Sequence, residues 1–303
     1  MSSKAEIREF KEGLYLIELR PELKGFSQFL GAWLYRYRGW TLLIDPGPAS
    51  TVSELKDSLK DLGINKVDLI LLTHIHLDHA GCVGHLSSAF RDSKILCHPK
   101  ARQHLIDPAR LWKGSKLVLK EIADAYGPPL GVEESRIVTE LPSEMEALII
   151  DTPGHAPHHI SFKIGEVLFV GEALGVHLKI HGKRYMRVAT PPRFIYETYR
   201  DSILRLKALK AEYVAFGHFG ISEFKISLFE DAISQIDLWV KVIGENRELI
   251  EKGNYSEMIN RLLGSDPYLY LYNKMDRDTK EREDFFIKKS MDGIYGYISS
   301  KKD

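Results

Sequence analysis

The chain has 303 residues, of which 44% are hydrophobic and 28% are charged, with 42 basic and 42 acidic side chains. This composition excludes a disordered or fibrous protein and supplies enough apolar residues for a substantial core. Because the two charge counts balance, no global electrostatic field points to a nucleic acid partner.

Short apolar runs near the amino terminus predict successive strands at Leu14–Leu19, Phe29–Tyr37 and Trp40–Ile44, which are separated by turn-prone residues. Their close succession indicates a small antiparallel meander. Apolar residues then recur on one helical face over Thr51–Leu62, so we expect a helix there. The nearly continuous apolar run Val67–Leu72 is typical of a strand that is covered on both faces.

Strand and helix patterns continue to alternate after this run. We predict a helix at Ala80–Phe90, a strand at Ile95–Cys97, helical segments through Tyr126, and strands at Ala147–Ile150, Val167–Val170 and Tyr213–Phe216. Alternation of this kind predicts an α/β protein with layers of strands and helices.

The last part of the chain has a helical pattern. Apolar residues beyond Phe224 are spaced for one buried helix face, so we predict a first domain at residues 1–225 and a helical extension at residues 226–303. The pair Pro191-Pro192 predicts the start of the preceding helix, because proline is tolerated in a first helical turn.

A dense group of polar side chains directly follows the apolar run Val67–Leu72. It contains His74, His76, Asp78 and His79. Imidazole nitrogen suits borderline metals such as zinc and iron, and a carboxylate adds a harder, charged ligand. The group therefore predicts a metal site that can hold two adjacent cations.

Three more candidate ligands, His155, Glu172 and His218, each lie just beyond a predicted strand. If those strands share a sheet, their ends converge on one edge, where open α/β sheets place ligands. Each histidine taken alone has an ordinary core or surface role as its alternative. The joint pattern of ligand type, spacing and strand-end placement favours a metal centre.

These motifs make the sequence resemble the metallo-β-lactamase superfamily. The resemblance rests on the His-x-His-x-Asp-His motif at His74–His79, the Thr-Pro-Gly-His turn that ends at His155, the acidic residue Glu172, and the Gly-His pair at His218. It covers residues 10–225 and implies a four-layer αββα sandwich, here followed by the helical C-terminal extension.

The resemblance also implies a ligand set. His74, His76 and His155 would bind one metal, Asp78, His79 and His218 would bind the other, and Glu172 would bridge them. Asp45 would orient a ligand or the motif loop, with a simple turn carboxylate as the alternative. The sequence departs from the superfamily at Glu172, where aspartate is usual, and at Cys82 and His158, where glycine is common.

The implied activity is that of a binuclear metal-dependent hydrolase. Two divalent ions about 3.5–4 Å apart hold a bridging hydroxide that attacks the substrate, and Asp78 would accept the proton during turnover. Zinc is the expected metal, with iron and manganese as alternatives. The spacing looks closest to the glyoxalase-like, hydroxyacylglutathione hydrolase-like branch, which implies an ester or thioester of a small molecule as substrate.

Two other functions remain open. Persulfide dioxygenases resemble this motif set but use a single iron held by two histidines and one carboxylate, which here would be His74, His155 and Glu172. The other open function is ligand binding without catalysis, by a protein that keeps this fold. The identity of the bound metal distinguishes the hydrolase from the oxygenase. Low activity with metal fully bound would indicate the non-catalytic protein.

Several residues outside the motifs have two interpretations each. The stretch His177–Arg187 either presents cations to an anionic substrate group or forms a solvated basic loop. The tyrosines Tyr268, Tyr270 and Tyr272 are assigned to core packing, with an aromatic wall over the pocket or a homodimer interface as the alternatives. We assign His159 to structure, and His158 either lines the site or has a structural role.

The remaining features concern the compartment. The charged segment Met1–Glu12 lacks the apolar stretch of a secretory signal, so we expect a cytoplasmic protein without membrane contact. Two cysteines, Cys82 and Cys97, are too few for a disulfide framework, and Cys82 is assigned to packing. Many charges with few Gln and Asn favour a thermophilic source. No module typical of nucleic acid binding is recognisable.

Overall fold

The structure, a computed structural model, describes residues 5–301. The first four residues of the charged segment Met1–Glu12 therefore lie outside the described residues. The chain divides into two compact units, one formed by Met1–Ile149 with Phe162–Gly165 and the other by Ile150–Ser161 with Glu166–Asp303. The domain boundary placed after residue 225 remains a prediction.

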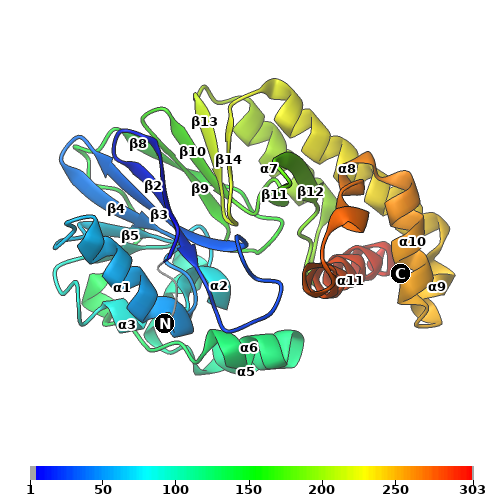
Figure 1. Ribbon diagram of the computed structural model, residues 1–303, viewed down its shortest axis with the longest axis horizontal. Helices are drawn as coiled ribbons and strands as arrows, with labels where there is room; N and C mark the ends of the chain where they lie inside the picture. Colours follow the sequence, from blue (N-terminus) through cyan, green and yellow to red (C-terminus); the bar gives the residue numbers. More distant parts are fainter. Residues whose placement is uncertain (1–4, 302–303) are drawn as a thin grey trace. The chain divides into compact units, whose positions relative to one another are not determined.

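The first unit is built on a seven-stranded mixed sheet whose spatial order follows the sequence (Figure 1). Its strands are β1 (Ile7–Lys11), β2 (Leu14–Leu19), β3 (Leu30–Tyr37), β4 (Trp40–Ile44), β5 (Leu69–Leu71), β6 (Lys94–Leu96) and β7 (Ile137–Val138). Strands β1 to β4 pair antiparallel, which confirms the meander, and β4 to β7 pair parallel. Parallel neighbours need crossover connections, and these carry the helices.

Helices and helical turns connect the strands of this unit. They are η1 (Ala49–Thr51), α1 (Val52–Asp61), α2 (Leu77–Ala80), α3 (Val83–Leu86), η2 (Pro99–Ala101), α4 (Arg102–Ile106), α5 (Ala109–Leu119), α6 (Glu121–Tyr126) and η3 (Glu134–Arg136). Helix α1 buries Leu55 and Leu59, as the predicted apolar face requires.

The continuous helix predicted at Ala80–Phe90 is wrong, since α2 and α3 are two separate short helices. In a continuous helix the Cys82 amide would donate to the carbonyl four residues earlier. Here it donates to the Gly47 carbonyl oxygen at 2.9 Å. This bond fixes the motif loop to the segment that follows β4.

Strand β5 leads into that motif loop from the middle of the sheet. Leu69, Ile70 and Leu71 are at most 3% exposed, as the continuous apolar run predicts for a strand covered on both faces. The Leu72 amide donates to the Leu96 carbonyl oxygen at 2.9 Å and so continues the pairing of the strand. The histidine motif thus begins on firmly held backbone.

A second sheet has five strands in the order β14-β13-β10-β9-β8. The strands are β8 (Ala147–Asp151), β9 (Ile160–Ile164), β10 (Val167–Gly171), β13 (Tyr213–Phe216) and β14 (Ile221–Glu223). Strand β10 pairs parallel with β13, and β13 pairs antiparallel with β14. Because β10 and β13 are parallel, the residues that follow them, Glu172 and His218, leave the sheet at the same edge.

The interpretation of His177–Arg187 as a solvated basic loop is wrong. The segment forms an antiparallel hairpin of β11 (Val176–Ile180) and β12 (Lys183–Arg187). His181 and Gly182 at its turn have φ values of 49° and 75°, as a two-residue type I′ turn requires. In β12, Tyr185 and Arg187 are buried, whereas Lys183 and Arg184 are exposed.

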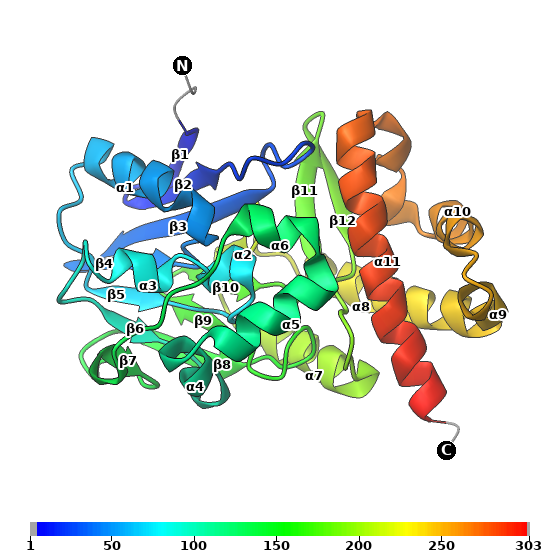
Figure 2. The ribbon, with the colours of Figure 1, turned by 90° about the horizontal axis from the view of Figure 1, so that it is seen from below.

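Helices make up most of the remaining second unit, which confirms the helical C-terminal region. They are α7 (Tyr196–Lys207), α8 (Ile226–Glu245), α9 (Arg247–Glu251), α10 (Tyr255–Ser265), η4 (Pro267–Leu269), η5 (Tyr272–Lys274) and α11 (Arg277–Ser300). Figure 2 shows α11 running alongside the β11–β12 hairpin. Across residues 5–301, none of the helices has both the length and the apolar composition needed to cross a bilayer.

Two further predictions concern this region. Pro191 and Pro192 do not open a helix, because α7 begins at Tyr196 and the Pro191 backbone lies against α11. Tyr272 is only 9% exposed and bonds to Asp284, consistent with packing, while Tyr270 is 50% exposed. A homodimer through these tyrosines remains a prediction.

A buried ion network ties the hairpin to α11. The carboxylate of Glu283 is fully buried and accepts hydrogen bonds from Arg187 Nε at 2.7 Å and the Tyr185 hydroxyl at 2.9 Å. Arg282 adds a third contact at 3.1 Å. Burial opposes ionisation of Glu283, but the two guanidinium groups outweigh it and hold the pKa of Glu283 below its usual range.

We expect Glu283→Ala to lower the free energy of unfolding by about 3–5 kcal/mol, because it leaves two buried guanidinium groups without their counter-charge. Guanidinium chloride unfolding measures this loss. Since the pKa of Glu283 is depressed in the folded state, the difference between wild type and variant should shrink as the pH falls through that pKa.

Glu281→Ala on the same helix is the matched control. Glu281 is exposed and pairs with Arg277 four residues earlier, so the change should cost no more than about 0.5 kcal/mol. Equal losses in the two variants would contradict a special role for the buried network.

Candidate metal centre

The first unit gathers the motif histidines around a buried carboxylate. His74 follows the end of β5, and His79 lies in α2, which begins at Leu77. Both histidines are 1% exposed, and Asp45, just beyond β4, is 2% exposed. Because β4 and β5 are parallel neighbours, the residues that follow them emerge at the same edge of the sheet.

Asp45 holds the motif loop from a strained position. Its φ of 48° lies in the left-handed region, where non-glycine residues are uncommon and often functional. Its carboxylate accepts hydrogen bonds from the Thr73 amide at 2.8 Å and the Thr73 hydroxyl at 2.6 Å. This confirms the expected contact with the motif loop.

The same network sets the tautomers of two histidines. Because the Thr73 hydroxyl donates to Asp45, its oxygen is left to accept from His74 Nδ1 at 3.0 Å. Asp45 Oδ2 likewise accepts from His79 Nδ1 at 3.2 Å. A carboxylate cannot donate, so the proton resides on Nδ1 and each ring keeps Nε2 as its potential ligand atom.

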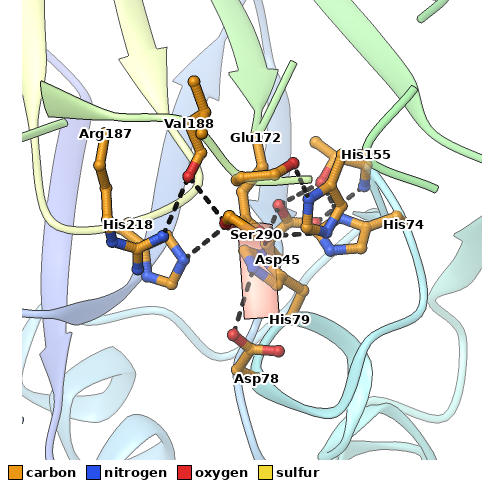
Figure 3. A network of polar contacts seen from close by, with 12 residues as sticks. Asp45, His74, Asp78, His79, His155, Glu172, Arg187, Val188, His218 and Ser290 are labelled. Carbon is orange, nitrogen blue, oxygen red and sulfur yellow. Dashed lines mark hydrogen bonds and ion pairs between the residues drawn. The ribbon is translucent and has the colours of Figure 1, made fainter. Parts of the chain in front are cut away.

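The other two motif residues lie beside these rings. The His76 ring is 4.6 Å from the His74 ring, and Asp78 Oδ2 is 3.6 Å from His79 Nε2. Figure 3 shows Asp45, His74, Asp78 and His79 in the polar network. The first unit therefore brings all four predicted ligands of the motif together. One ligand atom each of Asp45, His74 and His79 also fall within 4.8 Å of one another.

The second unit brings its three predicted ligands together, with Glu172 between His155 and His218. One carboxylate oxygen of Glu172 lies 3.0 Å from His155 Nε2, and the other lies 3.2 Å from His218 Nε2. The three residues are at most 8% exposed, and Figure 3 shows Glu172 with the two rings. Each oxygen of this carboxylate thus serves a different imidazole.

His155 is placed by the tight turn that the sequence indicated. Gly154 has a φ of 147°, and a Cβ there would lie 2.7 Å from the Tyr199 Cα of α7, so the turn needs glycine. His155 Nδ1 donates to the Ala189 carbonyl oxygen at 3.0 Å. A carbonyl oxygen only accepts, so this contact keeps the proton on Nδ1 and directs Nε2 towards Glu172.

His159 supports the backbone of Glu172, which confirms the structural assignment of this histidine. The Glu172 amide donates to His159 Nε2 at 3.1 Å, so His159 carries its proton on Nδ1 and donates to the Thr152 hydroxyl at 2.8 Å. The Thr152 hydroxyl in turn lies 2.9 Å from Ser161 Oγ. His158 is half-buried, and a role for it at the site remains a prediction.

The donor groups fit a divalent metal. Burial opposes ionisation of Glu172, but the neighbouring His155 and His218 outweigh it and hold the pKa of Glu172 well below its usual range. A buried ionised carboxylate between two imidazoles is a donor set for borderline cations such as zinc. In the first unit, two buried imidazoles with fixed tautomers offer the same chemistry.

Two buried residues near the strands have other roles. Cys82 is fully buried and its thiol donates to the Pro46 carbonyl oxygen at 3.1 Å; burial raises the pKa of this thiol, as expected for a packing residue. His177 stacks on Phe216 at 4.1 Å, and burial with the nearby Arg184 charge lowers the pKa of His177 to about 3. His177 lies within a regular strand, and no pattern in the sequence predicts that it packs on Phe216.

Two relatives show how far sequence similarity extends. A metallo-beta-lactamase fold-containing protein of Sulfurisphaera tokodaii is 28% identical over 196 residues, which span 61% of this chain and 71% of the relative. The hydroxyacylglutathione hydrolase of Psychromonas ingrahamii is 32% identical over 133 residues, 44% of this chain. That match covers only 41% of the length of the hydrolase.

Solved structures give the same picture. An archaeal metallo-beta-lactamase superfamily protein from Sulfolobus tokodaii has a TM-score of 0.62 at 25% identity, over 74% of this chain and 85% of that protein. A metallo-beta-lactamase family protein from Thermus thermophilus has a TM-score of 0.61 at 19% identity, over 88% and 95% of the two chains. At that identity the second match shows the fold alone.

The family model of the metallo-beta-lactamase superfamily matches residues 32–218, which include every predicted ligand from His74 to His218. The α/β class with a C-terminal helical region agrees with this match. The chain belongs to the metallo-beta-lactamase superfamily.

Proposed function

We propose that this protein is a metal-dependent hydrolase that holds two divalent ions and acts on an ester or thioester of a small molecule. The observation that carries the proposal is the buried Glu172, whose two oxygens each contact a different histidine. A carboxylate placed in this way is suited to bridge two ions. An oxygenase with one iron would use a single oxygen of the carboxylate.

The proposal assigns the seven ligands to two ions. His74, His76 and His155 would hold one ion, Asp78, His79 and His218 would hold the other, and Glu172 would contact both. The Nδ1 contacts of His74, His79 and His155 support this assignment, because they leave Nε2 as the nitrogen that would bind the ion after losing any proton it carries. Zinc suits the mixture of imidazole and carboxylate best.

Divalent ions bound by such ligands lower the pKa of water towards about 7 and polarise the carbonyl that is attacked. The chain itself keeps the ligands in place and handles the proton. Asp45 and Thr73 orient two imidazoles, and His159 holds the backbone of Glu172. Asp78 is the side chain that we propose accepts the proton during turnover.

The substrate class is proposed from the relatives. Several of them are hydroxyacylglutathione hydrolases, whose name describes cleavage of a thioester. Their matches cover 44%, 47% and 52% of this chain. Together with the superfamily membership, this supports a thioester as the first substrate to test. Lactones and phosphodiesters are attacked by the same kind of centre and form the comparison set.

Purified wild-type protein should contain close to two divalent ions per chain, mainly zinc, when elemental analysis is done by mass spectrometry. Glu172→Ala should lower the occupancy of both ions, and His76→Ala that of one. His98→Ala is the control, because His98 caps η2 and should leave the metal content unchanged. Close to one iron per chain would favour the oxygenase, and no metal after reconstitution would contradict the proposal.

Asp45→Asn should weaken zinc binding by about 10-fold to 100-fold, since the amide cannot accept all of the hydrogen bonds that fix His79 and Thr73. Competition with a chromophoric chelator measures the affinity. Asp57→Asn on α1 removes an exposed carboxylate of the same unit and should have no effect. Unchanged zinc affinity in Asp45→Asn would show that the carboxylate does not support the ligands.

Asp78→Asn should lower kcat/KM for a hydroxyacylglutathione by at least about 100-fold, because the proton acceptor is lost. Steady-state thioester cleavage by zinc-loaded protein measures the change. The exposed Asp92→Asn serves as the matched control and should retain full activity. If zinc-loaded wild type cleaves no thioester, lactone or phosphodiester, the hydrolase proposal fails and a non-catalytic member of the fold is favoured.

A further inference from the structure

The segment that follows β12 connects His155 with the C-terminal helix α11. Its residue Ala189 supplies the carbonyl oxygen that accepts from His155 Nδ1 at 3.0 Å. Val188, Ala189 and Thr190 are 1%, 4% and 0% exposed, so water does not hold this backbone. The position of the Ala189 carbonyl therefore depends on protein groups, which include those that contact its two neighbours.

A single side chain of α11, Ser290, contacts both neighbours. Its hydroxyl donates to the Val188 carbonyl oxygen at 3.1 Å and accepts from the Thr190 amide at 3.4 Å. The Thr190 hydroxyl donates to the Ser290 carbonyl oxygen at 3.0 Å. Figure 3 shows Ser290 beside the Val188 carbonyl. Ala189 is thus held on both sides by one residue of the helix.

Close packing of α11 fixes the same segment. A Cβ at Gly293, almost one turn beyond Ser290, would lie 1.9 Å from the Thr190 carbonyl oxygen and 2.7 Å from that of Pro191. Both are backbone atoms, which cannot yield as the end of a flexible side chain does. Glycine in a helix interior is unfavourable relative to alanine. Its presence here is explained by the close approach of the two backbones.

A second contact ties Val188 to the helix through Arg187. The Arg187 Nη1 donates to the Val188 carbonyl oxygen at 3.3 Å, while its Nε donates to Glu283 of α11 at 2.7 Å. Arg187 is 2% exposed and Glu283 is fully buried. The Val188 carbonyl therefore accepts from two donors, and both are attached to the helix or belong to it.

We propose that α11 is part of the metal-binding machinery: Ser290 and Gly293 position the Ala189 carbonyl, which in turn orients His155. The inference rests on the proposed function, because it requires His155 to be a metal ligand. Groups that orient a ligand imidazole set its tautomer and its direction. Ser290 is a positioning residue, since it acts on His155 only through the backbone of Ala189.

Ser290→Ala tests the inference in the full-length protein. With Zn²⁺ as the probe, chelator competition should show about tenfold weaker binding of one of the two zinc ions, the low end of what such supporting groups contribute. Ser300→Ala on the same helix removes a hydroxyl that donates to the Tyr297 carbonyl oxygen. This control should leave both zinc affinities unchanged.

A double-mutant cycle separates positioning from a general loss of stability. In a His155→Ala background, Ser290→Ala should weaken zinc binding no further, because the residue through which it acts is absent. In the metal-free protein, the ring ¹⁵N and ¹H shifts of His155 should show a weaker Nδ1–H hydrogen bond in Ser290→Ala than in wild type. If Ser290→Ala does not fold, Thr190→Val, which removes the companion hydrogen bond at similar volume, takes its place.

The outcomes distinguish this inference from the proposed function. If wild type binds no zinc, or if His155→Ala leaves both zinc affinities unchanged, the proposed function fails. If His155→Ala weakens one zinc ion while Ser290→Ala leaves both unchanged, only the positioning role of α11 is overturned. An equal loss from Ser290→Ala in the wild-type and His155→Ala backgrounds would overturn it as well.

Discussion

A buried imidazole can bind a metal only if one ring nitrogen is unprotonated and directed at the ion, and burial removes the water that would otherwise accept a hydrogen bond from the N–H of the other nitrogen. Three histidines are directed in this way through contacts of their Nδ1 atoms. His74 is anchored by the Thr73 hydroxyl, His79 by Asp45, and His155 by the Ala189 carbonyl. In each case Nε2 is left as the ligand atom.

Glu172 shows the same constraint for a carboxylate. Ionising it inside the protein is costly unless opposite charges and hydrogen-bond donors surround it. His155 and His218 supply them, and the pKa of Glu172 is accordingly low. Its backbone amide is held in turn by His159, which relies on Thr152.

The helical C-terminal region supplies specific contacts to the rest of the second unit. Its longest helix, α11, carries the carboxylate that neutralises Arg187 and the serine that holds the backbone around Ala189. The hairpin β11–β12 depends on this helix, because a buried guanidinium without a partner would be strongly destabilising. The same helix therefore stabilises the hairpin and holds the backbone that contacts His155.

The sequence alone determined the superfamily, the α/β class and the predicted ligands, because alternating apolar runs and closely spaced histidines are local patterns. Strands β2, β4 and β13 also have the predicted bounds, since their mainly apolar runs end close to turn residues. The short strands β7 and β14 have too few residues for a detectable period. Only the tertiary structure decided that His177–Arg187 is a hairpin and that α2 ends before Cys82. The partner of the Cys82 amide, Gly47, is distant in sequence. The connection from Ser290 to His155 could not be predicted from the sequence either. It passes through the backbone carbonyl of Ala189, which any residue at that position would have.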